Sequence, residues 1–310
     1  MTTVEKIKAK ILDLAIRGKL VPQDPNDEPA SELLKRIRAE KEELVKAKKI
    51  KKEKNPSEIV IGSDGRPYEK FADGKTVCIE DELPFAIPNT WTLVRLQDIS
   101  GVISKGTTPR GGEKAYAQSG IKFIRAENVS GCIRLSLDSC RYIDATTHKG
   151  FLSRSILEAG DLLITIAGTL GRTGIVSKCD LPANTNQAVS FVRLDKNVEG
   201  VYVKYCLDST IVQDMMLGRK KVTGIPNLTL EIIARQLIPL PPLAEQKRIV
   251  AKIEKLFAET DKIAIAEDGL VCTAERINKK VLDLAIRGQL VPQDPNDEPA
   301  EELLKRIAEA

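Results

Sequence analysis

The strongest pattern in the sequence is a seven-residue repeat of apolar positions towards the C-terminal end. Alternating steps of four and three residues lead from Ile249 to Leu284, and nine of the eleven positions reached are apolar. Such a stripe, sustained over about five heptads, predicts a coiled-coil helix, because a single core helix of this length would overrun a compact domain. Pro241 and Pro242 suit its start, and Gly288 suits its C-terminal cap. The seam positions that we expect at a helix–helix interface are Ile249, Ile253, Leu256, Ile263, Leu270, Ile277, Val281 and Leu284.

The end of this pattern is repeated near the N-terminus. Residues 11–37 and 281–307 match at 24 of 27 positions, with an offset of 270. In the N-terminal copy, Val4, Ile7, Ile11 and Leu14 continue the same heptad register up to Gly18. A single copy at each end is unlike the short period of a solenoid. It indicates one structural module placed before and after a unique central segment.

Both copies contain the string LVPQDPNDEPA, which predicts a turn between two helices. Proline interrupts a helix, and Asp and Asn suit turns and the residue that caps the next helix. After the N-terminal copy we expect a second helix over 28–54. Its part 33–54 carries ten basic and four acidic residues. That composition is typical of a solvated helix face, and contact with phosphates or with a partner is the alternative.

The middle of the chain has a shorter, strand-like periodicity. The segment around Asp64-Gly65 alternates as a β-hairpin does. Beyond it, runs such as DLLITIAG and AVSFVRL predict strands, and helices are expected over 200–217 and 228–235. The predicted fold class is α+β, with one mixed globular domain joined to long helices. The expected domains are a helical module over 1–54, a connector over 55–85, the globular domain over 86–242 and a C-terminal helical module over 243–310.

Charge is distributed unevenly along the chain. The total of 48 Lys and Arg against 44 Asp and Glu gives only +4, too slight by itself to indicate nucleic acid. Residues 86–242 hold 19 basic and 13 acidic side chains, so the globular domain carries +6 and the remainder −2. The chain opens with no leader-like segment, and its apolar runs are far shorter than the roughly 20 residues of a membrane-spanning helix. We therefore expect a cytoplasmic protein without a membrane partner.

Four polar loops of the globular domain combine Arg or Lys with Thr, Asn and Gln: SKGTTPRGGEKAY, GTLGRTG, ANTNQA and GRKKVTG. Arg can bind guanine through two hydrogen bonds, Asn or Gln can do so with adenine, and Lys and Thr suit phosphates. Each loop is also typical of an ordinary surface turn, but the set together favours DNA. The candidate DNA-binding residues are Lys105, Thr107, Thr108, Arg110, Lys114, Arg125, Asn128, Thr169, Arg172, Asn186, Gln187, Arg219, Lys220 and Lys221.

No catalytic or metal-binding pattern accompanies these loops. The only histidine, His148, has no evident partner and suggests a structural or solvated residue, and Cys132 and Cys140 lack the spacing of a zinc site. GTLGRTG does not end in the Gly-Lys-Ser/Thr of a nucleotide-binding loop. Nothing in their spacing assembles the remaining candidate acids, which are Asp138, Asp144 and Asp161. We expect no catalytic residue, no bound metal and no cofactor in this chain.

Several strings together resemble the specificity (S) subunits of type I restriction–modification systems. They are the two copies of the repeated module, IPNTWTLVRLQDI and, most specifically, IPLPPLAEQKRIVAKIEKLF at 238–257. GDLLITIAGTLGRTG and NLTLEIIARQLIPLPP also look like segments of the family's target-recognition domains. The likeness covers nearly the whole chain.

The resemblance implies a DNA-recognition role without catalysis. In that family, antiparallel conserved helices hold two recognition domains apart, and each domain reads half of a bipartite site on double-stranded DNA. Adenine methyltransferase (M) subunits use S-adenosylmethionine and restriction (R) subunits use ATP, so these cofactors are expected on the partners.

This sequence departs from the family pattern in having a single recognition domain. A natural half-subunit, a truncated reading frame and an engineered fragment are the three explanations. Our hypothesis is that two copies pair through the seam, rebuilding a two-domain subunit that reads an interrupted palindrome. The alternatives are a non-catalytic coiled-coil scaffold whose globular domain binds protein and, with least support, a self-contained nuclease or methyltransferase.

Overall fold

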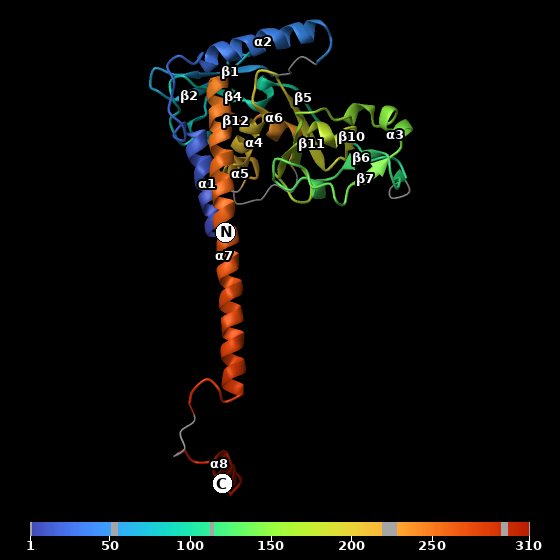
Figure 1. Ribbon diagram of the computed structural model, residues 1–310. Coiled ribbons are helices and arrows are strands. Elements are labelled where there is room, and N and C mark those ends of the chain that lie inside the picture. The colour runs from blue at the N-terminus through green and yellow to red at the C-terminus, as the bar shows by residue number, and fades with distance from the viewer. Residues whose placement is uncertain (1, 51–54, 112–114, 219–227, 293–296, 310) are drawn as a thin grey trace. The chain divides into compact units, whose positions relative to one another are not determined.

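The computed structural model describes residues 2–50, 55–111, 115–218, 228–292 and 297–309 (Figure 1). Its contacts divide the chain into two compact units, one ending at Leu256 and the other beginning at Phe257. The N-terminal module and the globular domain lie in the same compact unit. Helices and small sheets both contribute, which confirms the α+β class.

Local signals in the sequence correctly predict the first helix. α1 covers Thr3–Ile16 and starts with a capping box, in which Thr2 and Glu5 each accept a hydrogen bond from the backbone N–H of the other. It ends before Gly18, whose φ of +67° is the left-handed conformation that glycine adopts readily. The capping residues and the glycine thus account for both ends of the helix.

The second helix, α2, is shorter than expected. It covers Ala30–Lys46, whereas the sequence predicts a helix over 28–54. The chain turns directly after it, because Lys48 adopts a left-handed backbone with φ of +56°. Residues 51–54 lie outside the described residues. The many lysines that follow α2 favour helix by propensity alone, so composition overestimates its length.

The long C-terminal helix agrees with the heptad pattern. α7 covers Leu243–Ile286 and begins directly after the two prolines. It ends before Gly288, whose φ is +64°. The short helix α8, Ala300–Glu309, follows the second copy of the proline-rich turn.

The connector forms a small antiparallel sheet. Ile61 pairs with Pro67 at the end of the first two strands, and Gly65 turns the chain between them with a φ of +78°. This confirms the hairpin, and a third strand extends it. The strands are β1 Ser57–Ile61, β2 Pro67–Phe71 and β3 Thr76–Cys78, in the order β1-β2-β3.

Three further sheets build the globular domain. The largest is antiparallel and has the order β5-β11-β8-β9, and the others have the orders β10-β6-β7 and β12-β4. β10 and β6 are parallel neighbours. The strands are β4 Thr92–Arg95, β5 Ser100–Lys105, β6 Ile121–Ile124, β7 Arg141–Ile143, β8 Leu162–Thr165, β9 Thr173–Ile175, β10 Ala183–Thr185, β11 Val189–Leu194 and β12 Leu237–Leu240.

Short helices complete this domain. The stretch 200–217 is helical as expected, but Ser209, with a ψ of 144°, divides it in two. The α-helices are α3 Ala145–Lys149, α4 Gly200–Asp208, α5 Thr210–Met216 and α6 Leu230–Ala234. The 3₁₀ helices are η1 Glu80–Glu82, η2 Leu96–Ile99, η4 Ala126–Asn128, η5 Ser153–Ser155 and η6 Lys178–Asp180.

Apolar side chains from two of these sheets share one core. Leu163 and Phe191, from neighbouring strands of the large sheet, pack with Ile124 and Ala183 of the smaller one. Burial of such side chains contributes roughly 1.5–3 kcal/mol each. The core thus joins the two sheets from which three of the four polar loops emerge, after β5, after β8 and around β10.

Candidate nucleic-acid interface

Three of the four polar loops predicted to contact DNA converge in the globular domain. The loop after β5 is joined to the β10–β11 segment by two backbone hydrogen bonds, from the Gly106 N–H to the Val189 oxygen and from the Thr107 N–H to the Thr185 oxygen, both 3.1 Å. A Cβ atom on residue 106 would lie 2.1 Å from the Thr185 oxygen. Only glycine therefore permits this close approach.

The β10–β11 loop in turn contacts the β8–β9 loop. The Ile166 N–H donates to the Ala188 oxygen at 2.8 Å, and the Asn186 N–H donates to the Ile124 oxygen at 3.2 Å. The Asn186 Oδ1 atom accepts a hydrogen bond from the Ala188 N–H at 3.2 Å, so part of this amide serves its own turn. The neighbouring Gln187 is exposed. Hydrogen bonds thus link the β10–β11 loop both to the β8–β9 loop, about 20 residues earlier in the sequence, and to the loop after β5, about 80 residues earlier.

The β8–β9 loop is firmly built. The Thr165 Oγ1 atom accepts a hydrogen bond from the Arg172 N–H at 2.9 Å and donates to the Thr169 oxygen. Gly171, with a φ of +78°, is fixed from α5 because its oxygen accepts a hydrogen bond from the Gln213 Nε2 atom at 2.9 Å. Thr169 and Arg172 are exposed on this ordered loop. A preformed loop loses little conformational entropy when it binds a ligand.

The side chains at this surface leave cationic groups available for a ligand. Lys105, Arg110 and Arg172 are exposed, and no carboxylate in the described parts of the chain forms an ion pair with them. Cations without acidic partners suit DNA phosphates, and neighbouring hydroxyl and amide groups suit phosphates and base edges. The other predicted residues here are Thr107, Thr169 and Gln187, which are exposed, and Thr108 and Asn186, which are half-buried.

Two of the predicted DNA-binding residues, Asn128 and Arg125, make contacts within the chain. Asn128 is completely buried; its Oδ1 atom accepts a hydrogen bond from the Arg125 N–H at 2.9 Å, and its Nδ2 atom donates to the Ser136 oxygen at 2.9 Å. Arg125 is only partly exposed and forms an ion pair with Glu127. Contrary to expectation, Asn128 shapes a turn and offers no amide to a base. The string RAEN shows the residue types but not which way each side chain points.

The remaining predicted residues, Lys114, Arg219, Lys220 and Lys221, lie outside the described residues. The chain on both sides of 219–227 contacts the β8–β9 loop. A Cβ atom on Gly171 would lie 3.4 Å from the Leu217 side chain, and the Leu228 N–H donates to the Ile166 oxygen at 3.2 Å.

One candidate residue was missed by sequence reasoning. Phe151 is 49% exposed, and the guanidinium of Arg110 lies 5.1 Å from the centre of its ring. An aromatic residue directly after Gly150 in a polar stretch was the available signal. His148 nearby is structural, because it is buried and its Nδ1 atom contacts the Asn184 Oδ1 atom.

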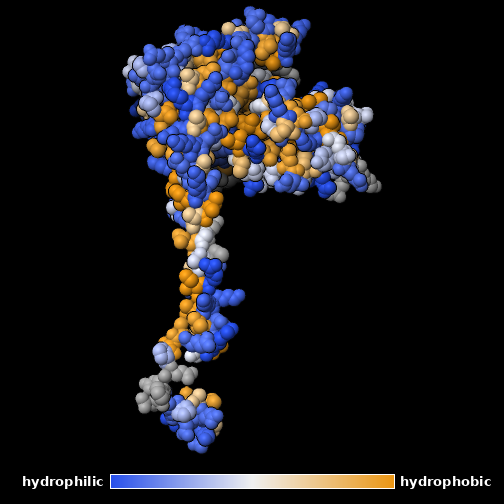
Figure 2. Space-filling model, in the orientation of Figure 1, coloured by the Kyte–Doolittle hydropathy of each residue, from blue (hydrophilic) through white to orange (hydrophobic). Residues whose placement is uncertain are grey.

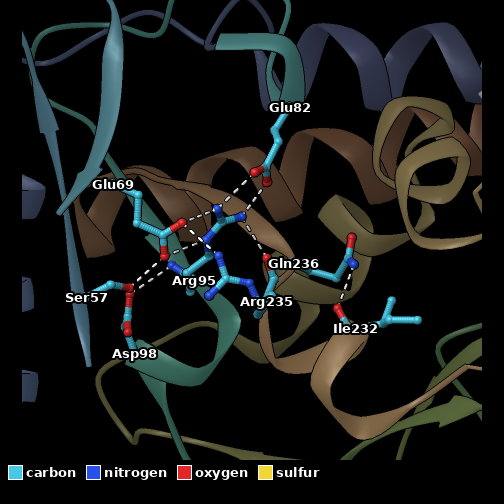
Figure 3. A network of polar contacts seen from close by, with 8 residues as sticks. All are labelled: Ser57, Glu69, Glu82, Arg95, Asp98, Ile232, Arg235 and Gln236. Carbon is cyan, nitrogen blue, oxygen red and sulfur yellow. Dashed lines mark hydrogen bonds and ion pairs between the residues drawn. The ribbon is translucent and has the colours of Figure 1, made fainter. Parts of the chain in front are cut away.

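A buried charge network joins the connector sheet to the globular domain (Figure 3). Arg95 at the end of β4 is 1% exposed; its Nη2 atom lies 2.6 Å from the Glu69 Oε2 atom of β2 and 3.0 Å from the Glu82 Oε1 atom. Arg235, after α6, donates to the same Glu69 oxygen at 2.8 Å. Ser57 of β1 donates to the Glu69 Oε1 atom at 2.6 Å. Five segments of the chain therefore meet on one guanidinium–carboxylate cluster.

The network keeps its members charged. Burial alone would raise the pKa of Glu69, but the hydrogen bonds from Arg95 and Ser57 hold that pKa below its ordinary value. Burial opposes the charge of Arg95 as well, yet hydrogen bonds and attraction from Glu82 and Glu69 raise its pKa above the usual range. A buried ion pair whose charged groups are all hydrogen-bonded has a structural role, and it offers no free group for acid–base chemistry.

Two further properties of the described residues bear on the class of site. No group of three or more His, Cys, Asp or Glu within the described residues is arranged to hold a metal ion. None of the helices in the described ranges is long and apolar enough to cross a membrane.

Comparison with known families decides where the chain belongs. The family model described as the type I restriction modification DNA specificity domain matches residues 88–267, more than half of the chain. The chain belongs to this family. The match contains all three loops that converge in the structure, so the candidate interface lies within the segment by which the family is defined.

Curated members of the family are similar over nearly the full chain. The chain is 30% identical to the type I restriction enzyme EcoAI specificity subunit of Escherichia coli, covering 99% of this chain and 55% of that protein. It is also 30% identical to the EcoEI specificity subunit of Escherichia coli, covering 98% of this chain and 54% of that protein. The chain thus spans about half the length of the curated relatives it matches.

The fold has a counterpart among solved structures. A chain from the structure described as the structural basis underlying complex assembly and conformational transition of the type I R-M system superposes with a TM-score of 0.53. The sequence identity is 20%, and the match covers 93% of this chain and 60% of that chain. At this identity the similarity establishes the shared fold.

Proposed function

We propose that this chain recognises one half of a bipartite DNA site for a type I restriction–modification complex. The observation that carries the proposal is the convergence of three polar loops within the family-defining segment, bearing cations that form no ion pair with a carboxylate among the described residues. Lys105 and Arg172 suit phosphates or guanine edges, and Gln187 suits adenine. The net charge of +6 on residues 86–242 favours DNA over a neutral partner.

The chemistry in such a complex belongs to partner chains. The proposed role of this subunit is to direct adenine methyltransferase (M) and restriction (R) subunits to the site, with S-adenosylmethionine and ATP bound by those partners. Belonging to the specificity-subunit family supports this division of labour.

DNA binding is tested with Arg172→Ala in the complex with M subunits. If Arg172 reads a base, the variant loses about 1–3 kcal/mol of affinity for the cognate site, roughly five- to 150-fold. Arg66→Ala is the matched control, because Arg66 is exposed, lies in the connector and pairs with Glu80 at 3.3 Å. Affinity of the unchanged protein should also fall steeply with salt. Weak binding that is indifferent to salt would contradict the proposal and favour a protein-binding scaffold.

The recognised sequence is measurable in the host. Methylation-sensitive sequencing of DNA from cells with and without this gene would reveal the modified motif. A motif that disappears with the gene supports the proposed role, and an interrupted palindrome would further support two-fold pairing of the chain. Identical methylation in both strains contradicts it.

We also propose that two copies pair through the heptad seam. Figure 2 shows apolar side chains, in orange, along the second part of α7. Ile263, Leu270 and Ile277 of the seam are 46%, 72% and 55% exposed, and such a row of apolar residues is unusual on a surface without a partner. Ile249 and Ile253 are instead fully buried within the first compact unit. The part of the seam offered to a second chain is therefore its later part.

Pairing is tested by sedimentation velocity with Ile277→Lys. A lysine in the seam should shift the protein to monomers, because its charge would be buried at the interface. Thr273→Lys adds the same side chain at an exposed position outside the seam and should leave the dimer intact. Unchanged protein that stays strictly monomeric at high micromolar concentration, with and without M subunits, would exclude the pairing.

A further inference from the structure

The two nearly identical copies of the repeated module have opposite surroundings. In the N-terminal copy, Ile16 is 1% and Leu33 0% exposed. Their counterparts in the C-terminal copy, Ile286 and Leu303, are 87% and 48% exposed. The same difference holds for the pairs Leu12 and Leu282, Leu34 and Leu304, and Ile37 and Ile307. One copy thus has a docking surface, and the other presents the same apolar face to solvent.

Specific contacts define what the N-terminal copy binds. Its Gly18 packs on Pro88, since a Cβ atom there would lie 2.4 Å from the Pro88 Cγ atom. Its Ala30 N–H donates to the Thr90 oxygen at 3.0 Å. Gly288 and Ala300 stand at the equivalent positions of the other copy. Neither of these interactions involves the three positions at which the copies differ.

The first turns of α7 supply the rest of the docking surface. Arg248 forms an ion pair with Asp27 of the N-terminal copy at 2.6 Å. Gln23 donates to the Glu245 Oε1 atom at 2.6 Å. Asp27 has a counterpart in Asp297, which is exposed. The surface thus binds the N-terminal copy through an ion pair and a hydrogen bond as well as through apolar contacts.

The course of α1 explains how a second chain could reach this surface. α1 runs antiparallel to the first turns of α7 in Figure 1, with the segment after it tied to Glu245 and Arg248. By sequence, α1 is a second copy of the last turns of α7. The N-terminal copy therefore shows how the end of another chain's α7 would pack in an antiparallel dimer.

We infer that the C-terminal module of one chain docks on the first compact unit of a second chain, in the place where that chain's own N-terminal module lies. The inference rests on the proposed pairing of two chains and adds a reciprocal exchange to it. Two nearly identical modules can then bind the same surface: the chain's own N-terminal module and the C-terminal module of the second chain. The effective concentration of each module at the surface decides which of them binds. Exchange of identical elements between protomers has a low energetic cost, because the same interactions form again between the two chains.

The experiment uses two full-length double variants of identical composition. Arg248→Asp repels the aspartate of both copies, and a second change restores the ion pair with only one of them. Arg248→Asp/Asp297→Arg favours the C-terminal copy, and Arg248→Asp/Asp27→Arg favours the N-terminal copy. We expect the first variant to dimerise about tenfold more tightly or better, because like charges at an interface are strongly disfavoured.

Hydrogen exchange locates the docked copy in each variant. Peptides 11–20 and 281–290 are distinguishable by mass, because Ile11 is replaced by Val281, which lacks one methylene group. In the first variant, 281–290 should exchange slowly and 11–20 quickly; the second variant should show the reverse. If both variants dimerise equally and slow hydrogen exchange is confined to 263–281, the proposed swap of modules is wrong but the dimer through the heptad seam remains supported. If both variants are monomers, the swap of modules and the seam dimer are both wrong. DNA recognition is judged separately by the Arg172 assay.

Discussion

Replacing Arg95 by methionine tests whether the buried charge network holds the connector sheet to the globular domain. The change removes the guanidinium that contacts Glu69 at 2.6 Å and Glu82 at 3.0 Å. Glu69, 1% exposed, then remains buried with one cation, because Arg235 still donates to it at 2.8 Å. Removing one partner of a buried pair costs about 3–5 kcal/mol. The residual cation places the expected loss at the lower end, about 3 kcal/mol.

The assay is urea unfolding followed by tryptophan fluorescence. Trp91 is the only tryptophan of the chain and is 6% exposed within the first compact unit, so its emission reports on the part that contains the network. In thermal unfolding followed by the same emission, a loss of about 3 kcal/mol corresponds to a fall in Tm of roughly 6–12 °C for a unit of this size. Arg66→Met is the control; its pair with Glu80 is exposed, and exposed pairs contribute about 0–1 kcal/mol.

The pH dependence follows from the lowered pKa of Glu69. A carboxylate whose pKa is lower in the folded than in the unfolded state stabilises the protein above the unfolded pKa, about 4.3, and loses that contribution as the pH falls through the folded pKa. Stability should therefore fall in acid less steeply in Glu69→Gln than in the unchanged protein. If Arg95→Met lowers the free energy of unfolding no more than Arg66→Met does, the network does not hold the two parts together.

Three further changes probe the loops and the module contact. Gly171→Ala should destabilise by about 1–2 kcal/mol and weaken DNA binding, because φ is +78° there; an unchanged urea midpoint and unchanged affinity would refute this. Phe151→Ala should leave Tm nearly unchanged and reduce DNA affinity two- to fivefold, since the contact of Arg110 with its ring contributes about 0.5–1 kcal/mol. Burial raises the pKa of Glu245, although the hydrogen bonds of its carboxyl group oppose the shift. The contribution of Glu245 to stability is therefore complete below about pH 4.3 and is lost as the pH rises through the folded pKa. Glu245→Gln should flatten that decline of the free energy of unfolding with pH.

Much of the architecture was predictable because it depends on neighbours in the sequence. The heptad pattern predicted α7, and Asp64-Gly65 predicted the turn of the connector sheet. Helix periodicity and turn residues depend on a few neighbouring positions, so they can be recognised in the sequence without knowledge of the fold. The division at Ser209 was missed because an apolar helical pattern continues across it.

The candidate interface was only partly predictable. Residue chemistry identified the loops that carry Lys105, Arg172 and Gln187, and the structure brings those loops together. It did not show that Asn128 points inward or that Phe151 stays exposed. The direction in which a polar side chain points depends on contacts between strands that are distant in the sequence. The local pattern of residue types does not reveal these contacts.

The repeated module separates the two kinds of information most clearly. Both copies end a helix in the same way, with Gly18 and Gly288 at φ of +67° and +64°, because the same residues impose the same local backbone. Yet Ile16 is 1% exposed and Ile286 is 87% exposed. The sequence by itself determined the helix, the turn and the apolar face of each copy. Only the tertiary structure decided which copy is covered, because burial requires a complementary surface from another part of the chain, and the N-terminal copy occupies it.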